Sequence, residues 1–164
     1  MNFGEKGENM TIAVCLLIIP AVFFGDLWLK NRVEKYISAR GGKREKKLFG
    51  GKLLIRRYHN RGAMLNAGEK NRAAVAVLSL LLTAVLIPVF ILSLGRRGNG
   101  LLRTGLALLL GGAFSNTYDR LKRKYVVDYL SFGVKWKWFR GIVFNISDFC
   151  IMIGALLSVL GAAK

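Results

Sequence analysis

Four long apolar runs, separated by polar segments, set the pattern of the chain. They cover residues 11–29, 73–94, 101–118 and 142–163. An α-helix rises about 1.5 Å per residue, so about 20 residues cross the hydrocarbon core of a bilayer. The first run is just long enough and contains Asp26, and the third reaches that length only with its polar end, residues 115–118. The pattern predicts an all-α integral membrane protein, in which four transmembrane helices form a single membrane domain over residues 1–164.

Two polar loops, residues 30–72 and 119–141, and one tight turn, residues 95–100, join the apolar runs. In the second loop, residues 125–132 are rich in β-branched and aromatic side chains and are predicted to be extended, with residues 53–58 as a candidate partner strand. Each span carries the chain across the membrane, so both loops lie on one side and both termini on the other. We therefore expect a small β-rich region on the loop side.

Composition and charge exclude several classes of protein. The chain has 26 Lys and Arg against 9 Asp and Glu, a net charge of +17, yet 53% of its residues are hydrophobic. A disordered basic tail lacks long apolar runs, so that class is excluded. One His and two Cys, far apart in the sequence, cannot make a zinc site from His and Cys ligands alone. We expect no metal, no cofactor and no nucleic-acid partner.

Glu and Asp residues occupy different parts of the chain. All five Glu lie in polar segments, whereas all four Asp lie near the end of a span or in the extended stretch. An ionisable group next to hydrocarbon is costly, which makes each Asp a functional candidate. By the parity of the spans, these Asp residues share one side of the membrane. Two carboxylates brought together there would share one proton, so that one acts as a base on water and the other as an acid.

Most of these Asp residues also have a structural interpretation. Asp26 can pair with Lys30 at i+4, and Asp119 can pair with either of two basic residues, 122 and 123, one turn on. For these two the structural interpretation is the better one. Asp148 can cap the N-terminus of the last helix. Asp128 has no local structural reason to lie between apolar residues, which favours a functional role.

Five short motifs contain these residues. They are Asp26-Leu-Trp-Leu-Lys30, Asn60-Arg-Gly-Ala63, Gly111-Gly-Ala-Phe-Ser-Asn-Thr-Tyr-Asp-Arg120, Tyr125-Val-Val-Asp-Tyr129 and Phe144-Asn-Ile-Ser-Asp148. In this order they resemble the motif set of bacterial lipoprotein signal peptidase, also called signal peptidase II. The resemblance implies that Asp128 and Asp148 form a catalytic aspartic dyad. It implies supporting or substrate-binding roles for Asp26, Lys30, Asn60, Gly62, Asn116, Asp119, Arg120 and Asn145.

The resemblance also implies a function. It implies an aspartic endopeptidase that removes the signal peptide from diacylglyceryl-modified prolipoproteins, cleaving just before the lipidated Cys. Such an enzyme is a multi-pass monomer of the bacterial cytoplasmic membrane, with its active site on the extracytoplasmic side and membrane lipids around it. Asn60, Asn116 and Asn145 offer amides that could hold substrate carbonyls or orient the dyad. Ser147 stands where that family usually has Ala, so its hydroxyl is expected to alter the hydrogen bonding of the dyad.

A non-enzymatic polytopic membrane protein is the alternative. It would be a proton-coupled carrier, or an anchor whose basic loop binds anionic lipid or nucleic acid. A carrier should hold its acidic residues nearer the middle of a span, and a polybasic anchor would need neither Asp128 nor the Asn motifs. The only histidine, His59, is expected to be a loop or headgroup contact rather than a base.

The charge distribution bears on orientation. Loop 30–72 contains 14 basic residues and loop 119–141 contains 7, against 5 elsewhere. Taken alone, the positive-inside rule places these loops in the cytoplasm, which is the reverse of what the resemblance implies. We follow the resemblance, because the motifs are more specific than a charge count. The excess charge is then expected to hold the loops to anionic headgroups.

Overall fold

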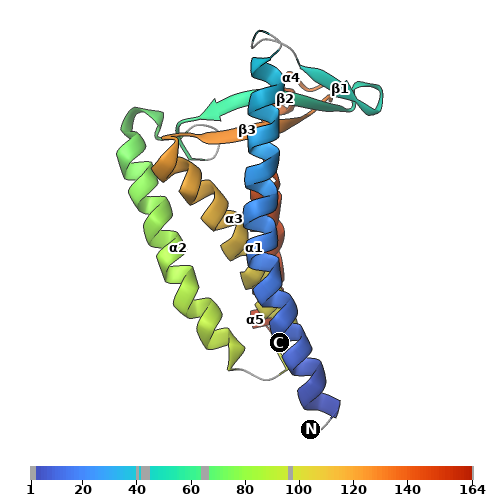
Figure 1. Cartoon of the computed structure of the whole chain (residues 1–164), viewed down its shortest axis with the longest axis vertical. Helices are drawn as coiled ribbons and strands as arrows, with labels where there is room; N and C mark the ends of the chain where they lie inside the picture. Colours follow the sequence, from blue (N-terminus) through green and yellow to red (C-terminus); the bar gives the residue numbers. More distant parts are fainter. Residues whose placement is uncertain (1–2, 40, 42–44, 64–66, 96–97, 164) are drawn as a thin grey trace.

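Each of the four apolar runs is helical over most of its length, and a small sheet lies across one end of the helices (Figure 1). The computed structural model describes residues 3–39, 41, 45–63, 67–95 and 98–163. The helices are α1 (Phe3–Ser38), α2 (Arg72–Leu94), α3 (Gly100–Lys122), α4 (Lys137–Gly141) and α5 (Ile146–Ala162). The strands are β1 (Lys46–Leu48), β2 (Leu53–Asn60) and β3 (Val126–Phe132), with short 3-10 turns at Phe49–Gly51 and Glu69–Asn71. Both chain ends lie away from the sheet.

Helix α1 is the largest departure from the sequence-based expectation. The expected span 11–29 is part of a 36-residue helix, so the first part of the predicted loop 30–72 is helical and that boundary is wrong. The reason is that buried side chains continue at helical spacing beyond the apolar run. Lys30, Val33 and Ile37 are all buried, and the last two pack against β3. Tertiary packing therefore extends the helix past the point where hydropathy falls.

Helix α5 begins later than expected. The predicted span started at residue 142, but residues 142–145 precede the helix, and Phe144 forms an antiparallel bridge with Leu130 of β3. The backbone N–H of each residue donates to the carbonyl of the other at 2.7 Å. This short extended segment ties the start of α5 to the sheet.

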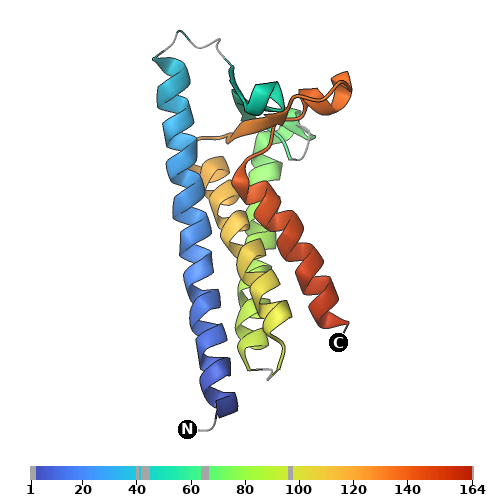
Figure 2. The same cartoon turned by 90° about the vertical axis from the view of Figure 1, so that its right-hand side faces the viewer.

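Two of the helices are long and apolar enough to cross a membrane, within the part of the chain that the structure describes. These are the regions Gly7–Ser38 and Glu69–Leu94, and α5 is a shorter apolar helix. Only 11% of the most apolar window of each is buried inside the protein, so their apolar side chains face outward. A helix in the core of a soluble protein would bury that surface instead. Helix α3 lies between the others and contacts α1, α2 and α5 (Figure 2).

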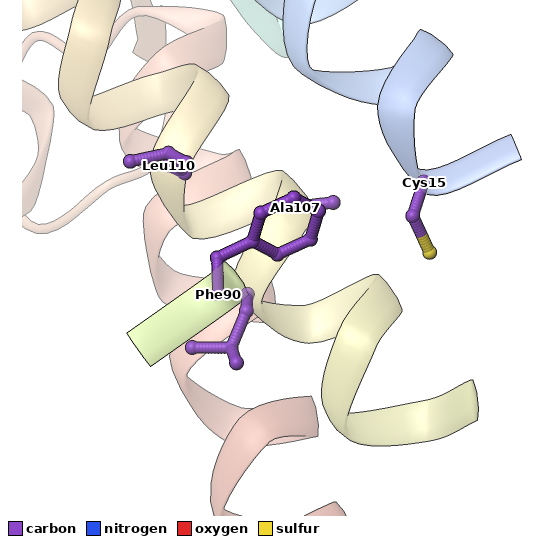
Figure 3. Packing of buried hydrophobic residues seen from close by; sticks show 5 residues of the cluster. Cys15, Phe90, Ala107 and Leu110 are labelled. Atoms are coloured by element: carbon purple, nitrogen blue, oxygen red, sulfur yellow. The ribbon is translucent and has the colours of Figure 1, made fainter. Parts of the chain in front are cut away.

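Small residues let α3 and α5 approach closely. A Cβ atom added at Gly154 of α5 would lie 2.6 Å from the carbonyl oxygen of Gly105 in α3. At the sheet end, a Cβ added at Gly112 would lie 2.6 Å from the carbonyl oxygen of Ser147. Such contacts are typical of helix pairs in membranes, where dispersion replaces the hydrophobic effect. Farther down the bundle a buried cluster joins α1, α2 and α3 through Cys15, Phe90, Leu106, Ala107 and Leu110 (Figure 3).

The sheet confirms the predicted extended segments. Its order is β1-β2-β3, all antiparallel, and in the β2–β3 pair Tyr58 lies opposite Asp128 and Asn60 opposite Val126. The prediction of strands at 125–132 and 53–58 is thus correct to within two residues. Strand β1 and helix α4 were not predicted, because each is only a few residues long and carries no periodic signal.

Candidate active site

Asp128 and Asp148 lie at the junction of the sheet and the helices. Asp128 is 2% exposed in β3, and Asp148 lies in the first turn of α5. Both carboxylates line one cavity of about 500 Å³ between α2, α3 and α5. Residues 20 positions apart are thus brought to one site by the connection that runs from β3 through α4 to α5.

Two side-chain amides hold Asp128. Asn145 Nδ2 donates to Oδ1 at 2.7 Å, and Asn60 Nδ2 donates to Oδ2 at 3.2 Å. The backbone N–H of Gly62 donates to Asn60 Oδ1 at 3.1 Å. This last bond fixes which end of the Asn60 amide faces Asp128, so Gly62 acts on the site through its backbone.

Asp148 is held by a third amide and by the helix start. Asn116 Nδ2 donates to Asp148 Oδ1 at 2.9 Å, and the backbone N–H of Asn145 donates to Oδ2 at 2.9 Å. In return the backbone N–H of Asp148 donates to Asn145 Oδ1, which completes a capping box. The residue at the N-cap is Asn145, so the interpretation of Asp148 as the cap itself is wrong. Asp148 is the third helical residue of the box and faces the cavity as well.

Burial and a neighbouring charge perturb Asp128. Burial raises the pKa of Asp128 from 3.8 to about 7, with a further contribution from the charge of Asp148, while the Asn145 and Asn60 amides act in the opposite direction. The like charge of Asp148 disfavours the doubly ionised pair. The pair therefore holds a proton near neutral pH, which is what acid–base chemistry by two carboxyl groups requires.

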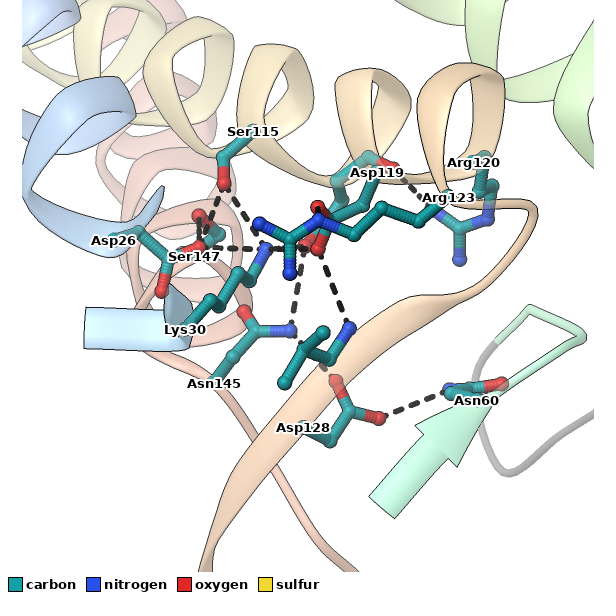
Figure 4. Close-up of polar contacts among 12 residues, drawn as sticks. Asp26, Lys30, Asn60, Ser115, Asp119, Arg120, Arg123, Asp128, Asn145 and Ser147 are labelled. Atoms are coloured by element: carbon teal, nitrogen blue, oxygen red, sulfur yellow. Dashed lines mark hydrogen bonds and ion pairs between the residues drawn. The ribbon is translucent and has the colours of Figure 1, made fainter. Parts of the chain in front are cut away.

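Lys30 is the centre of a buried ionic cluster beside the pair (Figure 4). Its side chain is fully buried, and Nζ lies 2.7 Å from Asp26 Oδ2 and 3.1 Å from Asp119 Oδ2. It also donates to Ser115 Oγ and Asn116 Oδ1, each at 3.0 Å. Because the ammonium binds the amide oxygen of Asn116, the amide nitrogen is left facing Asp148. Lys30 thus orients a group that contacts the pair, and the predicted Asp26–Lys30 pair is confirmed.

Asp26 is satisfied by hydroxyl groups from three other elements. Ser115 donates to Oδ2 at 2.7 Å, Tyr129 donates to Oδ1 at 2.9 Å, and Ser147 also donates to Oδ2. The expectation that Ser147 alters the hydrogen bonding of the dyad is wrong, because its hydroxyl turns to Asp26. Ser115 and Tyr129 were missed, and their only signal in the sequence was membership of two of the motifs.

Asp119 and Arg120 have separate roles. Asp119 accepts from the backbone N–H of Val127 at 3.3 Å and lies 3.0 Å from Arg123 Nε, so the structural interpretation through residue 123 is confirmed. Arg120 lines the cavity instead, and donates to the carbonyl oxygen of Gly62 at 3.1 Å. The two neighbours thus point to different networks, one structural and one at the cavity.

His59 is not in a loop. It lies in β2, where its Nε2 is 2.5 Å from Glu34 Oε1 of α1 and its ring stacks on Tyr125 with centroids 4.0 Å apart. The prediction of a loop position is therefore wrong, and His59 joins the sheet to α1. Among the described residues, no group of three or more His, Cys, Asp or Glu side chains is arranged to hold a metal ion.

The fold is shared with two solved structures. Two solved structures described as bacterial membrane enzymes, studied by the in meso method, match 93% of this chain. The first has a TM-score of 0.74 at 23% identity and is covered over 89% of its length. The second has a TM-score of 0.70 at 22% identity and is covered over 94%.

Sequence comparison identifies the family. Residues 18–164 match the family described as Signal peptidase (SPase) II. The lipoprotein signal peptidase of Paraburkholderia phytofirmans is 34% identical over 160 residues, which cover 94% of this chain and 87% of that protein. That of Lactobacillus johnsonii is 32% identical over 145 residues, 88% of each chain. The chain belongs to the signal peptidase II family of bacterial membrane peptidases.

Proposed function

We propose that this protein is an aspartic endopeptidase that removes the signal peptide from diacylglyceryl-modified prolipoproteins, cutting just before the lipidated Cys. One observation carries the proposal. Two carboxyl groups, Asp128 and Asp148, line one largely apolar cavity, are positioned by three amides, and hold a proton near neutral pH. Family membership supports the peptidase role.

The chemistry follows from one proton shared by two carboxyl groups. The ionised carboxylate takes a proton from a water molecule, whose oxygen attacks the scissile carbonyl carbon. The protonated carboxyl group donates its proton to the carbonyl oxygen, so no free oxyanion builds up next to hydrocarbon. The tetrahedral intermediate then collapses: the C–N bond breaks, and the amine of the Cys takes up the proton that the first carboxylate removed from water. One hydroxyl group of the intermediate returns its proton to the second carboxylate, so the pair again holds one proton. Neither a metal nor a thiol takes part.

Two cavities meeting at Asp128 suit the two ends of such a substrate. The large cavity has walls of Leu, Val, Ile and Met side chains from the helices, which suit acyl chains and a signal-peptide helix. A second cavity of about 230 Å³ adjoins it and shares Asn60, Asp128, Ile142 and Val143. It lies next to the sheet, beside Tyr58 and Trp138, and suits the polar chain that follows the Cys. A peptide crossing Asp128 would have one end in each cavity.

Arg120 is a candidate substrate contact. It lines the large cavity, and its buried Nε is without a hydrogen-bond partner in the described part of the chain. A donor left unpaired in a buried position costs free energy, so a substrate carbonyl there would stabilise the complex. We assign Arg120 to binding the substrate backbone rather than to proton transfer.

The membrane placement is part of the proposal. The helices α1, α2, α3 and α5 cross the bacterial cytoplasmic membrane, and the sheet and the carboxyl pair lie on the extracytoplasmic side. Residues 1–164 act as one membrane domain and as a monomer, with lipids and a prolipoprotein as partners. The pair lies at the sheet end of the helices rather than in mid-span, which argues against the carrier alternative.

Cleavage by purified variants tests the proposal. Asp128→Asn and Asp148→Asn should each lower the turnover of a diacylglyceryl-modified prolipoprotein by several orders of magnitude, because Asn cannot exchange a proton with water. The double variant should be little worse than either single one, since the two groups act as a unit. A gel-shift assay in detergent measures the product. Glu45→Gln, which removes an exposed carboxylate just before β1, is the matched control and should keep full activity.

Two results would contradict the proposal. Near-normal turnover by Asp148→Asn would mean that Asp148 serves only in the capping box and is not catalytic. Loss of activity with a chelator, restored by zinc, would refute a metal-free mechanism.

A further inference from the structure

A strained aromatic residue lies at the tip of the β1–β2 hairpin. Phe49 has φ +49°, in the left-handed region, and is followed by Gly50 and Gly51, which also have positive φ. A bulky residue in that region is a genuine outlier that costs free energy. The Phe49 side chain is 79% exposed, so no packing inside the protein compensates for the strain.

Basic and aromatic residues flank this tip along the chain and in the segment that pairs with it. The carbonyl oxygen of Lys52 accepts from the backbone N–H of Gly133 at 2.8 Å, so the segment after β3 runs against the hairpin turn. That segment presents Lys135 and Trp136, and Trp136 is 79% exposed. Together these residues form what we call the hairpin patch, defined as Lys46, Lys47, Phe49, Lys52, Lys135 and Trp136.

The acidic group next to the patch does not neutralise it. Glu45 precedes the patch and is paired with Arg56, whose Nε lies 3.1 Å from Glu45 Oε2. Each Lys of the patch is exposed. The patch therefore presents an excess of positive charge together with two exposed aromatic rings, which is the combination found at membrane–water interfaces.

The hairpin projects sideways beyond the helices, with the sheet running across their ends (Figure 1). If the helices span a bilayer, a hairpin that projects in this way runs along its surface. We propose that the hairpin patch binds anionic phospholipid headgroups, with its lysines on the phosphates and with Phe49 and Trp136 inserted at the acyl boundary. This binding proposal depends on the proposed membrane placement and not on the peptidase chemistry.

Tryptophan quenching in bilayers of two compositions tests the patch. In a Trp28→Phe background, Trp136 and Trp138 are the remaining indoles. The full chain is reconstituted in phosphatidylcholine alone or mixed with phosphatidylglycerol, each with a shallow spin-labelled lipid. Quenching should be stronger with phosphatidylglycerol, and added salt should reduce the difference because it screens the charges. Equal quenching in the two bilayers would overturn the proposal.

Charge-matched variants distinguish lipid binding by the hairpin patch from a general effect of the net positive charge. Replacing Lys46, Lys47, Lys52 and Lys135 by Gln should abolish the phosphatidylglycerol-dependent part of the quenching. Replacing the exposed Lys35, Lys70, Lys122 and Lys124 by Gln makes the same change in net charge and should leave it intact. An equal loss in both variants would show a diffuse charge effect and contradict the proposal. Prolipoprotein cleavage in detergent by the patch variant should be unchanged, so a failure of the peptidase function is recognised separately.

Phe49→Gly tests the role of the strain. Gly adopts a positive φ without penalty, so the variant should have a higher melting temperature in detergent and weaker quenching in both bilayers. A lower melting temperature would mean that Phe49 packs within the protein, and would contradict its role as a membrane anchor.

Discussion

Single residues near the site are held by groups from distant parts of the chain, and Lys30 is the clearest case. Its ammonium is fully buried between Asp26 and Asp119 and also binds the amide of Asn116. Ionic groups taken out of water are tolerated when each is paired and hydrogen-bonded, and that condition is met here. Removing the cation alone leaves the buried Asp26 carboxylate without its ion-pair partner, while Asp119 keeps only Arg123.

Lys30→Met is therefore expected to destabilise the protein by about 3–5 kcal/mol, because breaking a buried pair costs more than the pair itself contributes. It should also lower the activity of the remaining folded protein, since Asn116 loses the bond that orients it toward Asp148. Thermal unfolding in detergent and the cleavage assay measure the two effects. Lys35→Met, an exposed site on the same helix, is the control and should change neither by much.

The raised pKa of Asp128 predicts how activity depends on pH. If the pair needs one shared proton, activity should fall as the pH rises through about 7, where Asp128 loses its proton. A pH–rate profile of kcat measures this. Activity that stays level well above that pH would contradict a working pair with one proton.

The same shift of the Asp128 pKa predicts that stability, like activity, falls as the pH rises. The folded protein holds the proton more tightly than the unfolded chain, so the favourable contribution is complete below pH 3.8 and is lost as the pH rises to about 7. Asp128→Asn cannot ionise. It should therefore melt at a higher temperature than the unmodified protein at about pH 8, and the gain should vanish in acid. If the variant and the unmodified protein had the same melting temperature at pH 8 as well as in acid, burial would not perturb Asp128.

At the scale of elements, the close approach of α3 and α5 sets the position of Asp148. Gly112 of α3 faces the carbonyl oxygen of Ser147, one residue before Asp148, with no room for a Cβ atom. A methyl group there must push the first turn of α5 away from α3. The contact thus links helix packing directly to the geometry of the carboxyl pair.

Gly112→Ala should destabilise the protein by about 1–3 kcal/mol, as overpacking does, and should also reduce cleavage. Gly25→Ala is the matched control, because Gly25 is also helical and has nothing within 4 Å of an added Cβ. The control should be neutral or stabilising, since Ala is the better helix former. Equal melting temperatures for the two variants would mean that α5 moves without cost.

For the whole molecule, the sheet lies at one end of the helices and both chain ends lie away from it (Figure 2). The end of α2 and the start of α3 lie at the far end from the sheet, and the end of α1 is on the sheet side. The basic residues are concentrated on the sheet side, where the positive-inside rule expects cytoplasm. Attachment of the hairpin patch to anionic headgroups would offer these charges a partner outside the cell.

Cysteine labelling distinguishes the two orientations. In a background where Cys15 and Cys150 are replaced by Ala, Ala39→Cys should react with an impermeant reagent in intact cells, and Gly95→Cys should react only after the cells are opened. Both positions are exposed, so access through the membrane decides the outcome. Labelling of position 95 and not of position 39 in intact cells would reverse the proposed orientation.

The sequence by itself determined the helical membrane class, the β2–β3 pair, the motif residues and the Asp26–Lys30 pair. These depend on local properties: apolar length, β-propensity, i+4 spacing and short motifs. Only the tertiary structure decided that α1 runs on to Ser38, that Ser147 binds Asp26, that His59 joins the sheet to α1, and that Asn145 bonds with both carboxyl groups. Each of these depends on a contact between residues far apart in the chain or on the exact start of a helix. A buried polar side chain bonds to whichever polar group the fold brings next to it. A local sequence pattern does not contain that information.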